Sequence, residues 1–341
     1  MTADTAYRLA AEGTALLWRS DYQNARQLLQ ALERRIDRPR KVRRKPSEPE
    51  AAPGAAFHRH RQARAQRAHT LSMLLIPFDA DYGIPLRRAP DVRLACSEAW
   101  GPGKEACVTS LRELLGLIGA HEWRKKGVAV PALGAHIHPH YGVFAPIRSE
   151  YVGLVAAAPL SNKSLAFDIG TGTGVLAAVL ARRGVEKITA TENDERALVC
   201  ARDNIARLGL EAKVEVVQAD MFPAGRAPLI VCNPPWIPSQ PSAPIERAVY
   251  DAGGRMLRAF LAGLAAHLEP DGEGWLILSD IAEHLGLRTR EELLAMIDAG
   301  GLKVLSRGEA RPQHPKVRDM NDPLHAARAA EITSLWRLGV R

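Results

Sequence analysis

The chain has 341 residues, of which 46% are hydrophobic and 25% are charged, so it is long and apolar enough for a packed core of one or two domains. Aromatic residues make up only 5%, and the composition excludes collagen-like, mucin-like and disulfide-scaffold proteins. The formal net charge is +8, and residues 34–67 alone hold twelve Lys or Arg against three acids.

The cysteines and the apolar runs indicate the compartment. The four cysteines are scattered without a CxxC pair, which favours a reducing environment, and we expect a cytoplasmic protein. Asp4, Glu12 and Arg19 interrupt the N-terminal stretch where a secretory signal needs an unbroken apolar run. No run of about 18 apolar residues occurs, so we expect no membrane partner.

The first part of the chain is predicted to be mainly helical. Residues 1–37 repeat Leu and Ile at helical intervals without Pro, which predicts an N-terminal helical segment. Residues 38–56 combine Pro, Ala, Gly and positive charge without periodicity and indicate a basic, Pro-rich linker. Positive charge of this density attracts RNA or an acidic protein surface by counterion release, but it is equally typical of a solvated linker.

Residues 57–148 are predicted to form a helical substrate-recognition region. Helices are expected over 57–75 and 103–123. Residues 128–146 break repeatedly at Pro and Gly, which predicts a short hairpin at the end of this region.

Residues 149–341 have the pattern of an α/β domain. After a helix over 149–158, apolar runs of strand length alternate with helical stretches, which is typical of a mostly parallel sheet covered by helices on both faces. The segments 303–307 and 331–338 are expected to form an antiparallel hairpin at the sheet edge. Strands are predicted over 165–168, 187–192, 213–218, 228–232 and 274–280, and helices over 174–183, 194–208, 255–268 and 290–299.

A glycine-rich loop follows the first of these strands. In the sequence DIGTGTG, Gly170, Gly172 and Gly174 remove side chains, so backbone N–H groups and the next helix can approach a nucleotide. The GxGxG spacing departs from the GxGxxG fingerprint and disfavours NAD and FAD. The alternative interpretation is a glycine turn without a ligand.

Acidic residues follow the next two strands. Glu192 lies 22 residues after Gly170, near the spacing at which an acid binds ribose hydroxyls. Asp194 competes for that role but fits better as the N-cap of the following helix. Asp220 follows the third strand, where an acid or its backbone reads an adenine amino group, although surface carboxylates at strand ends are common.

The sequence Asn233-Pro234-Pro235-Trp236 directly follows the predicted strand over 228–232. Consecutive prolines stiffen the loop and free the Pro234 carbonyl, while the Asn233 side chain supplies a second acceptor. Two such acceptors hold one NH2 group and orient its nitrogen toward an electrophilic methyl group. Trp236 is expected to stack on the planar acceptor. The alternative is a rigid turn with a packing Trp.

Three further features border this site in sequence. His136, His138 and His140 alternate as metal ligands do, but no carboxylate or cysteine completes the set nearby, and we expect no metal. Tyr141, next to these histidines, is predicted to line the substrate pocket. Tyr250, after the proline loop, is an equal candidate for the pocket or for ordinary packing.

These motifs resemble the class I S-adenosylmethionine-dependent methyltransferases that carry an NPP(Y/F/W) motif. The resemblance is to HemK-type protein glutamine N5-methyltransferases and to the methyltransferase small-domain family, and it spans residues 142–280. It implies a Rossmann-like seven-stranded sheet and S-adenosylmethionine as cofactor. Trp236 stands where that family usually has Tyr, and the N-terminal region is longer than the family's helical substrate domain.

The resemblance also implies roles for individual residues. Asp168 to Gly174, with Thr171, would hold the methionine part of the cofactor, Glu192 the ribose, and Asp220 the adenine side. Asn233 and Pro234 would hold the acceptor, with Pro235 and Trp236 completing the catalytic loop. Residues 142–150 resemble the HemK-type lead-in to the first helix, and Arg148 within them is a candidate substrate residue.

The sequence therefore predicts an enzyme that methylates a planar NH2 nitrogen. The first choice of acceptor is a glutamine side chain in a protein of the translation machinery. The second is an exocyclic amine of RNA or DNA, guanine N2 or adenine N6, and a small molecule is a third. A hypothesis of another class is a non-catalytic, cofactor-binding module that associates with RNA.

Overall fold

The chain folds into two units. The computed structural model describes residues 1–38, 54–147, 149–241, 244–312, 319–320 and 322–341. Contacts divide the chain into Met1–Lys125 and Lys126–Arg341. Most of the predicted linker, residues 39–53, lies outside the described residues. The predicted boundary at residue 148 stays a prediction, but the contacts assign the segment 126–148 to the second unit. Among the described helices, none has the length and apolar character needed to cross a membrane.

The first unit contains helices and a small sheet. Strands β1 (Leu16–Leu17), β2 (Leu74–Phe78) and β3 (Cys107–Ser110) form a three-stranded sheet in this order. The first unit is mainly helical as predicted, but these three short strands overlap residues that were expected to be helical, within 1–37, 57–75 and 103–123. Pro77 lies within β2, and it is tolerated because β1 pairs only with Leu74 and Leu75. The helices are α1 (Ala3–Ala11), α2 (Tyr22–Ile36), α3 (Ala55–Ser72), α4 (Arg93–Trp100) and α5 (Leu111–Lys126).

A capping residue explains where α2 begins. Asp21 Oδ1 accepts hydrogen bonds from the backbone N–H of Gln23 at 2.9 Å and of Asn24 at 3.3 Å. Arg88 donates to both oxygens of the same carboxylate at 2.7 Å, and this hydrogen bonding lowers the pKa of Asp21 to about 2. The cap therefore also joins the start of α2 to the loop after β2.

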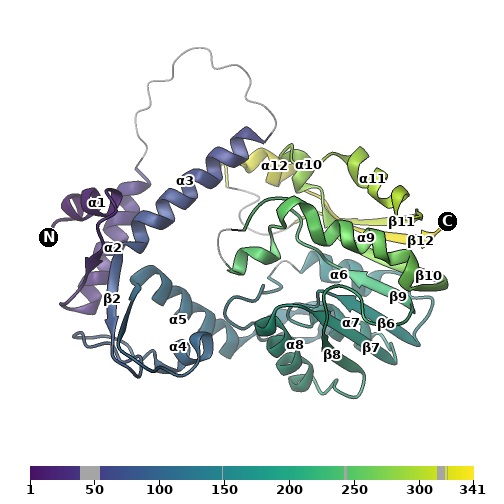
Figure 1. Ribbon diagram of the computed structural model, residues 1–341, viewed down its shortest axis with the longest axis horizontal. Coiled ribbons are helices and arrows are strands. Elements are labelled where there is room, and N and C mark those ends of the chain that lie inside the picture. Colours follow the sequence, from purple (N-terminus) through teal and green to yellow (C-terminus); the bar gives the residue numbers. More distant parts are fainter. Residues whose placement is uncertain (39–53, 148, 242–243, 313–318, 321) are drawn as a thin grey trace, which may run out of the picture. The chain divides into compact units, whose positions relative to one another are not determined.

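The second unit is built on a seven-stranded sheet, which confirms the predicted Rossmann-like fold class (Figure 1). Six strands run in the same direction, and β12 is antiparallel to both of its neighbours, β10 and β11. The expected antiparallel hairpin of the last two strands is confirmed, with β11 at the sheet edge. In spatial order the strands are β11 (Leu302–Ala310), β12 (Thr333–Val340), β10 (Leu268–Ser279), β9 (Ala227–Cys232), β6 (Leu165–Ile169), β7 (Lys187–Glu192) and β8 (Val214–Gln218).

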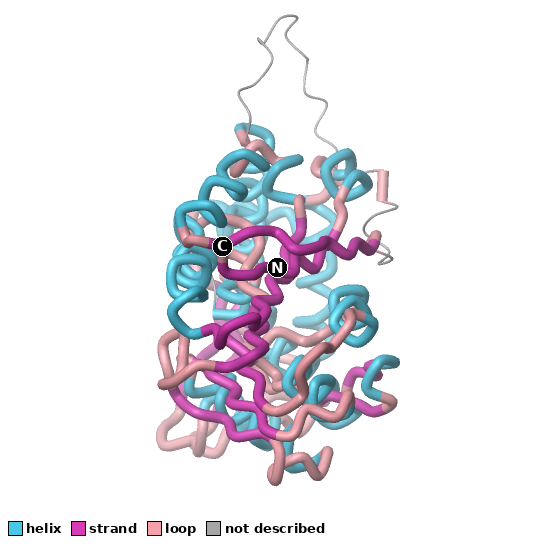
Figure 2. The backbone as a smooth tube through the Cα atoms, turned by 90° about the vertical axis from the view of Figure 1, so that its right-hand side faces the viewer, coloured by secondary structure: helices cyan, strands magenta, loops and turns pink. Residues whose placement is uncertain are grey.

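Helices cover both faces of this sheet (Figures 1 and 2). One face packs against α6 (Glu150–Ala157), α7 (Val175–Arg182) and α8 (Glu195–Arg207). The other face packs against α9 (Arg255–His267) and α11 (Arg290–Ala299). Two short helices, α10 (Ile281–His284) and α12 (His325–Ala330), and the predicted hairpin of β4 (Val128–Val130) and β5 (Ala135–Ile137) complete the unit.

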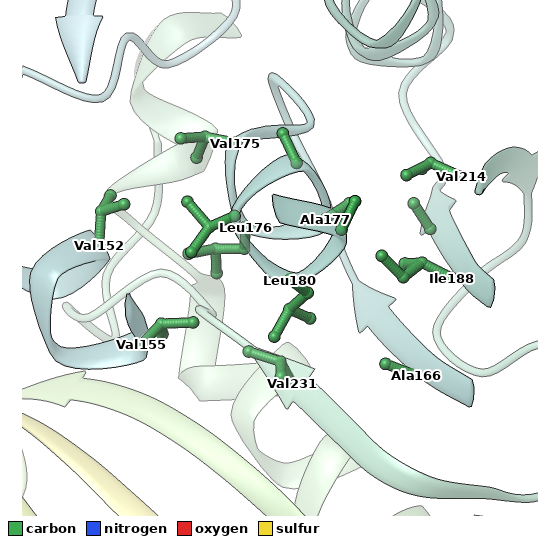
Figure 3. Close-up of a cluster of buried hydrophobic side chains, with 14 of the residues drawn as sticks. Val152, Val155, Ala166, Val175, Leu176, Ala177, Leu180, Ile188, Val214 and Val231 are labelled. Carbon is green, nitrogen blue, oxygen red and sulfur yellow. The ribbon is translucent and has the colours of Figure 1, made fainter. Parts of the chain in front are cut away.

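Alternation of side chains along the strands creates two separate cores. Leu229 and Val231 of β9 belong to the core beneath α7, whereas Ile230 and Cys232 belong to the core beneath α9. Helix α7 is buried in seven of its eight residues, so its sequence VLAAVLAR is apolar all round. Figure 3 shows its side chains between β9 and α6. This packing fixes the start of α7 at the carboxyl end of β6, where the glycine loop lies.

Candidate functional site

The glycine loop joins β6 to α7 with an unusual backbone. Gly170, Gly172 and Gly174 have φ values of +69°, +58° and +80°, a region that residues with a Cβ adopt rarely. A Cβ added at Gly172 would have no heavy atom within 4 Å, so the space beside this residue is open. The loop therefore offers an accessible backbone at the end of a buried strand.

Asp168 fixes the loop from within. It is 1% exposed, and its Oδ2 accepts hydrogen bonds from Thr171 Oγ1 at 2.6 Å and from the Ala177 N–H at 3.0 Å. Burial raises the pKa of Asp168 to about 6, although these hydrogen bonds act in the opposite direction. The carboxylate thus holds the loop against the first turn of α7, and its predicted contact with the cofactor stays a prediction.

Replacing Asp168 by Asn is expected to change how stability depends on pH. Above pH 3.8 the unfolded chain releases the Asp168 proton, but the folded chain keeps it up to about pH 6. The unfolding free energy of the wild type therefore falls through this window by about 3 kcal/mol more than that of the Asn variant. Urea unfolding at pH 4 and pH 7 measures this difference.

Glu273→Gln is the control for the Asp168 experiment. Burial raises the pKa of Glu273, but hydrogen bonds from Arg337 and Trp275 outweigh burial and lower it overall. The Glu273 variant should therefore lose stability relative to the wild type as the pH rises, whereas the Asp168 variant should gain it. If the unfolding free energies of wild type and Asp168→Asn changed equally between pH 4 and pH 7, the raised pKa of the buried Asp168 would be contradicted.

Glu192 lies at the end of β7 and faces the glycine loop. Its Oε2 accepts a hydrogen bond from the Gly172 N–H at 3.0 Å, and its Oε1 accepts from the N–H groups of Asn193 and Asp194. The Thr171 N–H also donates to the Thr191 carbonyl, at 2.9 Å. The structure thus brings together the glycine loop and the acid that the sequence predicted as the ribose ligand.

Asp194 takes the structural role expected from its position. Its Oδ1 accepts hydrogen bonds from the N–H groups of Arg196 at 2.9 Å and Ala197 at 3.2 Å, so it caps α8. This leaves Glu192 as the acid of the pair that faces the glycine loop.

Asp220 lies beyond β8 and is exposed. Its carboxylate forms a long ion pair with Arg255 Nη1, at 3.4 Å to each oxygen. Arg255 is the first residue of α9, and the next residue, Met256, lies against the glycine loop, because a Cβ added at Gly170 would come within 2.3 Å of Met256 Cε. The third predicted acid therefore borders the same site, and its contact with adenine stays a prediction.

The proline loop begins where the buried strand β9 ends. Strands β6 and β9 are neighbours, with Ile169 opposite Cys232, so the glycine loop and Asn233 leave the sheet side by side. Pro234 is buried, and Asn233 is partly exposed. The Trp236 indole N–H donates to Asn233 Oδ1 at 2.9 Å, a contact that the sequence did not indicate.

The chain returns to this loop at Tyr250. Tyr250 forms a bridge with Ile237, and the Asp251 N–H donates to the Ile237 carbonyl at 3.0 Å. Asp251 Oδ2 in turn accepts from the Met256 N–H at 2.6 Å and so fixes the start of α9. Tyr250 therefore lies directly beside the residue that follows Trp236, and its contact with a substrate stays a prediction.

Sequence reasoning missed Asn204, a buried residue of α8 that is 1% exposed. Its Oδ1 accepts from the His138 N–H at 2.7 Å, and its Nδ2 donates to the Thr173 carbonyl at 3.0 Å. This one amide joins the segment after β5 to the glycine loop. The available signal was an Asn between apolar residues on the inner face of a helix.

The three histidines do not form a common site. His136 is exposed on β5, the His138 backbone is bound by Asn204, and His140 Nε2 lies 2.9 Å from Asp203 Oδ2. Within the residues that the structure describes, no group of three or more His, Cys, Asp or Glu side chains is arranged to hold a metal ion. Tyr141 is partly buried in the following segment, and Arg148 lies outside the described residues.

Comparison with known proteins identifies the second unit's main segment. Residues 135–293 match the family described as "Methyltransferase small domain". The methyltransferase class that the motifs predicted is confirmed for this segment.

Three curated relatives match part of the chain. Ribosomal protein L11 methyltransferase of Sorangium cellulosum is 32% identical over 164 residues, 48% of this chain and 43% of the relative. Release factor glutamine methyltransferase of Cereibacter sphaeroides is 32% identical over 173 residues, which are 47% of this chain and 60% of the relative. tRNA1(Val) (adenine(37)-N6)-methyltransferase of a Shewanella species is 30% identical over 141 residues, which are 39% of this chain and 59% of the relative. The chain thus matches less than two thirds of the length of these relatives.

Proposed function

We propose that the protein, whose residues 135–293 match the methyltransferase small domain family, transfers a methyl group from S-adenosylmethionine to a planar NH2 nitrogen. The observation that carries the proposal is the position of the Asn233-Pro234 loop. It leaves the sheet beside the glycine loop, from the neighbouring strand. In parallel α/β sheets, ligands bind at the carboxyl ends of adjacent strands, where both loops lie.

The residues at the end of β6 and β7 fit the methyl donor. The open space beside Gly172 admits a ligand to the backbone, and the Glu192 carboxylate faces this space from its bond to the Gly172 N–H. Glu192 Oε2 retains one lone pair for a ribose hydroxyl, because it accepts only the Gly172 N–H, whereas Oε1 accepts the N–H groups of Asn193 and Asp194. S-adenosylmethionine would supply a methyl group bound to a positively charged sulfur.

Asn233 and the Pro234 carbonyl would prepare the acceptor nitrogen. The lone pair of an amide or aromatic amine is delocalised, so this nitrogen is a poor nucleophile. Holding both N–H groups orients the lone pair toward the methyl carbon and stabilises the positive charge that develops on nitrogen. The N–C bond forms as the S–C bond breaks, the sulfur takes the bonding pair, and the nitrogen then releases one proton to solvent.

A glutamine side chain in a protein of the translation machinery is the first acceptor that we propose. The sequence of residues 142–150, which resembles the HemK-type lead-in, supports it. Two of the relatives carry names for methylation of ribosomal protein L11 and of release-factor glutamine. Both are proteins of translation, and a cytoplasmic location fits such an acceptor.

An exocyclic amine of RNA is the second acceptor, favoured by helix α3. This helix carries four Arg and three His but no acid, and Arg59 and Arg64 are exposed. The formal charge of +8 belongs to the first unit, because residues 126–341 hold 24 Lys or Arg and 24 Asp or Glu. Such a unit attracts phosphates, and one relative is named for adenine methylation in tRNA.

One labelling experiment separates the acceptor classes. The protein is incubated with methyl-labelled donor and a cell lysate, and the products are treated with protease or with nuclease. Label lost to protease supports the glutamine acceptor, and label lost to nuclease supports RNA or DNA. Label that resists both treatments indicates a small molecule, and no incorporation at all favours the non-catalytic module.

Charge reversal at Arg59 and Arg64 is expected to test the RNA acceptor separately. If α3 contacts phosphates, the double change to Glu weakens tRNA binding by about tenfold or more at low salt, because two attractive charges become repulsive. Fluorescence anisotropy with labelled tRNA measures this affinity. Arg8→Glu and Arg112→Glu make the matched control in the same unit. Equal affinities for the wild type and the α3 variant would remove α3 from RNA recognition.

A further inference from the structure

The proline loop contains a hydrogen bond that the proposed reaction does not by itself require. The Trp236 indole Nε1–H donates to Asn233 Oδ1 over 2.9 Å. Trp236 packs against the cores on both faces of the sheet, so the ring is held by apolar contacts. The donor therefore has a fixed position relative to the amide.

The two ends of an asparagine carboxamide have nearly the same shape but opposite hydrogen-bonding properties. Oδ1 only accepts and Nδ2 only donates, so an acceptor clamp functions with Oδ1 toward the substrate and fails with Nδ2 there. The indole N–H is a donor only. In the flipped amide it would face the Nδ2 donor, and both groups would lack a partner.

We propose that Trp236 is a positioning residue that selects the orientation of the Asn233 carboxamide. Its N–H uses one lone pair of Oδ1 and leaves the other for a proton of the acceptor NH2 group. The inference rests on the proposed function. It also gives the Trp at this place a role that Phe lacks, since Phe supplies a stacking ring without an N–H.

The hydrogen bond itself is tested without methyl transfer, by NMR of the indole N–H groups. The chain has six tryptophans, and the resonance of Trp236 is assigned by its loss in Trp236→Phe. In Asn233→Ala this resonance should move upfield and exchange faster with solvent. Trp275, whose N–H donates to Glu273 Oε2 at 2.9 Å, is the internal control and should not move.

The positioning role is tested by a double-mutant cycle with Asn233→Asp. A carboxylate has two equivalent oxygens, so it needs no partner to choose its orientation. Trp236→Phe should lower kcat about tenfold in the wild-type background, with the KM for acceptor little changed because a ring remains. In the Asn233→Asp background the same change should cost about twofold or less.

Each result bears on the proposal. An unmoved Trp236 resonance in Asn233→Ala overturns it, as does an equal loss of kcat in both backgrounds. Complete inactivity of Asn233→Asp also overturns it, because a symmetric acceptor should function at this position. A wild-type enzyme that shows the hydrogen bond by NMR but methylates nothing would remove the proposed function and leave the hydrogen bond in place.

Discussion

Asn233→Ala is expected to lower kcat by about 1000-fold, the size of effect seen when one preorganised group that stabilises developing charge is removed. The Kd for S-adenosylmethionine should change by about threefold or less. The glycine loop is held by Asp168 and Glu192, and neither of them is bound to the Asn233 side chain. Single-turnover kinetics and calorimetry measure the two quantities.

The matched control for Asn233 is Asn24→Ala, an exposed asparagine of the first unit. It should leave both kcat and Kd unchanged. Unchanged turnover in Asn233→Ala would remove Asn233 from the mechanism. Loss of donor binding together with turnover would instead indicate that the loop serves the donor rather than the acceptor.

Glu192→Ala is expected to weaken donor binding by about 100-fold, with a smaller effect on kcat at saturating donor. The change removes a charged acceptor for a ribose hydroxyl and leaves the Gly172 N–H without its 3.0 Å partner. Hydrogen bonds to charged groups contribute about 1.5–3 kcal/mol each, so the loss of one or two accounts for an effect of this size. Calorimetric titration with S-adenosylmethionine measures it.

Two variants calibrate the Glu192 result. Glu192→Gln keeps one acceptor oxygen and should fall between the wild type and Glu192→Ala. Glu195→Ala removes an exposed acid from the first turn of α8, three residues further on, and should leave the Kd unchanged. Equal donor affinity in wild type and Glu192→Ala would show that the ribose is held elsewhere.

The sheet of the second unit was predictable because its strands are short apolar runs that alternate with helices. The expected strand 187–192 coincides with β7, and the expected strand 213–218 differs from β8, Val214–Gln218, by one residue at its start. Strand β10 begins at Leu268, six residues before the predicted start, because its first part pairs irregularly with β9. The sequence EPDGEG at residues 269–274 is charged and rich in Gly, so it lacks the apolar pattern from which a strand is predicted.

The strands of the first unit were not predictable in the same way. β1 has two residues, and β2 follows α3 after a single residue, so no Pro or Gly marks the point where the helix ends and the strand begins. Pro77 within β2 argued against a strand. Pro77 is tolerated in β2 because β1 ends before it and pairs only with Leu74 and Leu75. This pairing is a tertiary contact, which the local sequence does not reveal.

In the site, residues that directly follow strands were predictable from the sequence, whereas contacts between residues far apart in the chain were not. The glycine loop, Glu192 and Asn233 were found from their positions after strands. The contacts of Asn204 with His138 and of Met256 with Gly170 join residues 66 and 86 positions apart. No spacing rule predicts such pairs, because they depend on how α8 and α9 pack on the sheet.

The insertion of β12 between β10 and β11 has a consequence for biosynthesis. Thr333, Leu335 and Leu338 are at most 2% exposed, so the part of the sheet between β10 and the edge strand β11 is completed by residues that the ribosome adds long after β10. Until they emerge, β10 presents an unpaired edge of apolar residues to other nascent chains. We therefore expect the nascent protein to depend on chaperones during the interval between the synthesis of β10 and that of β12.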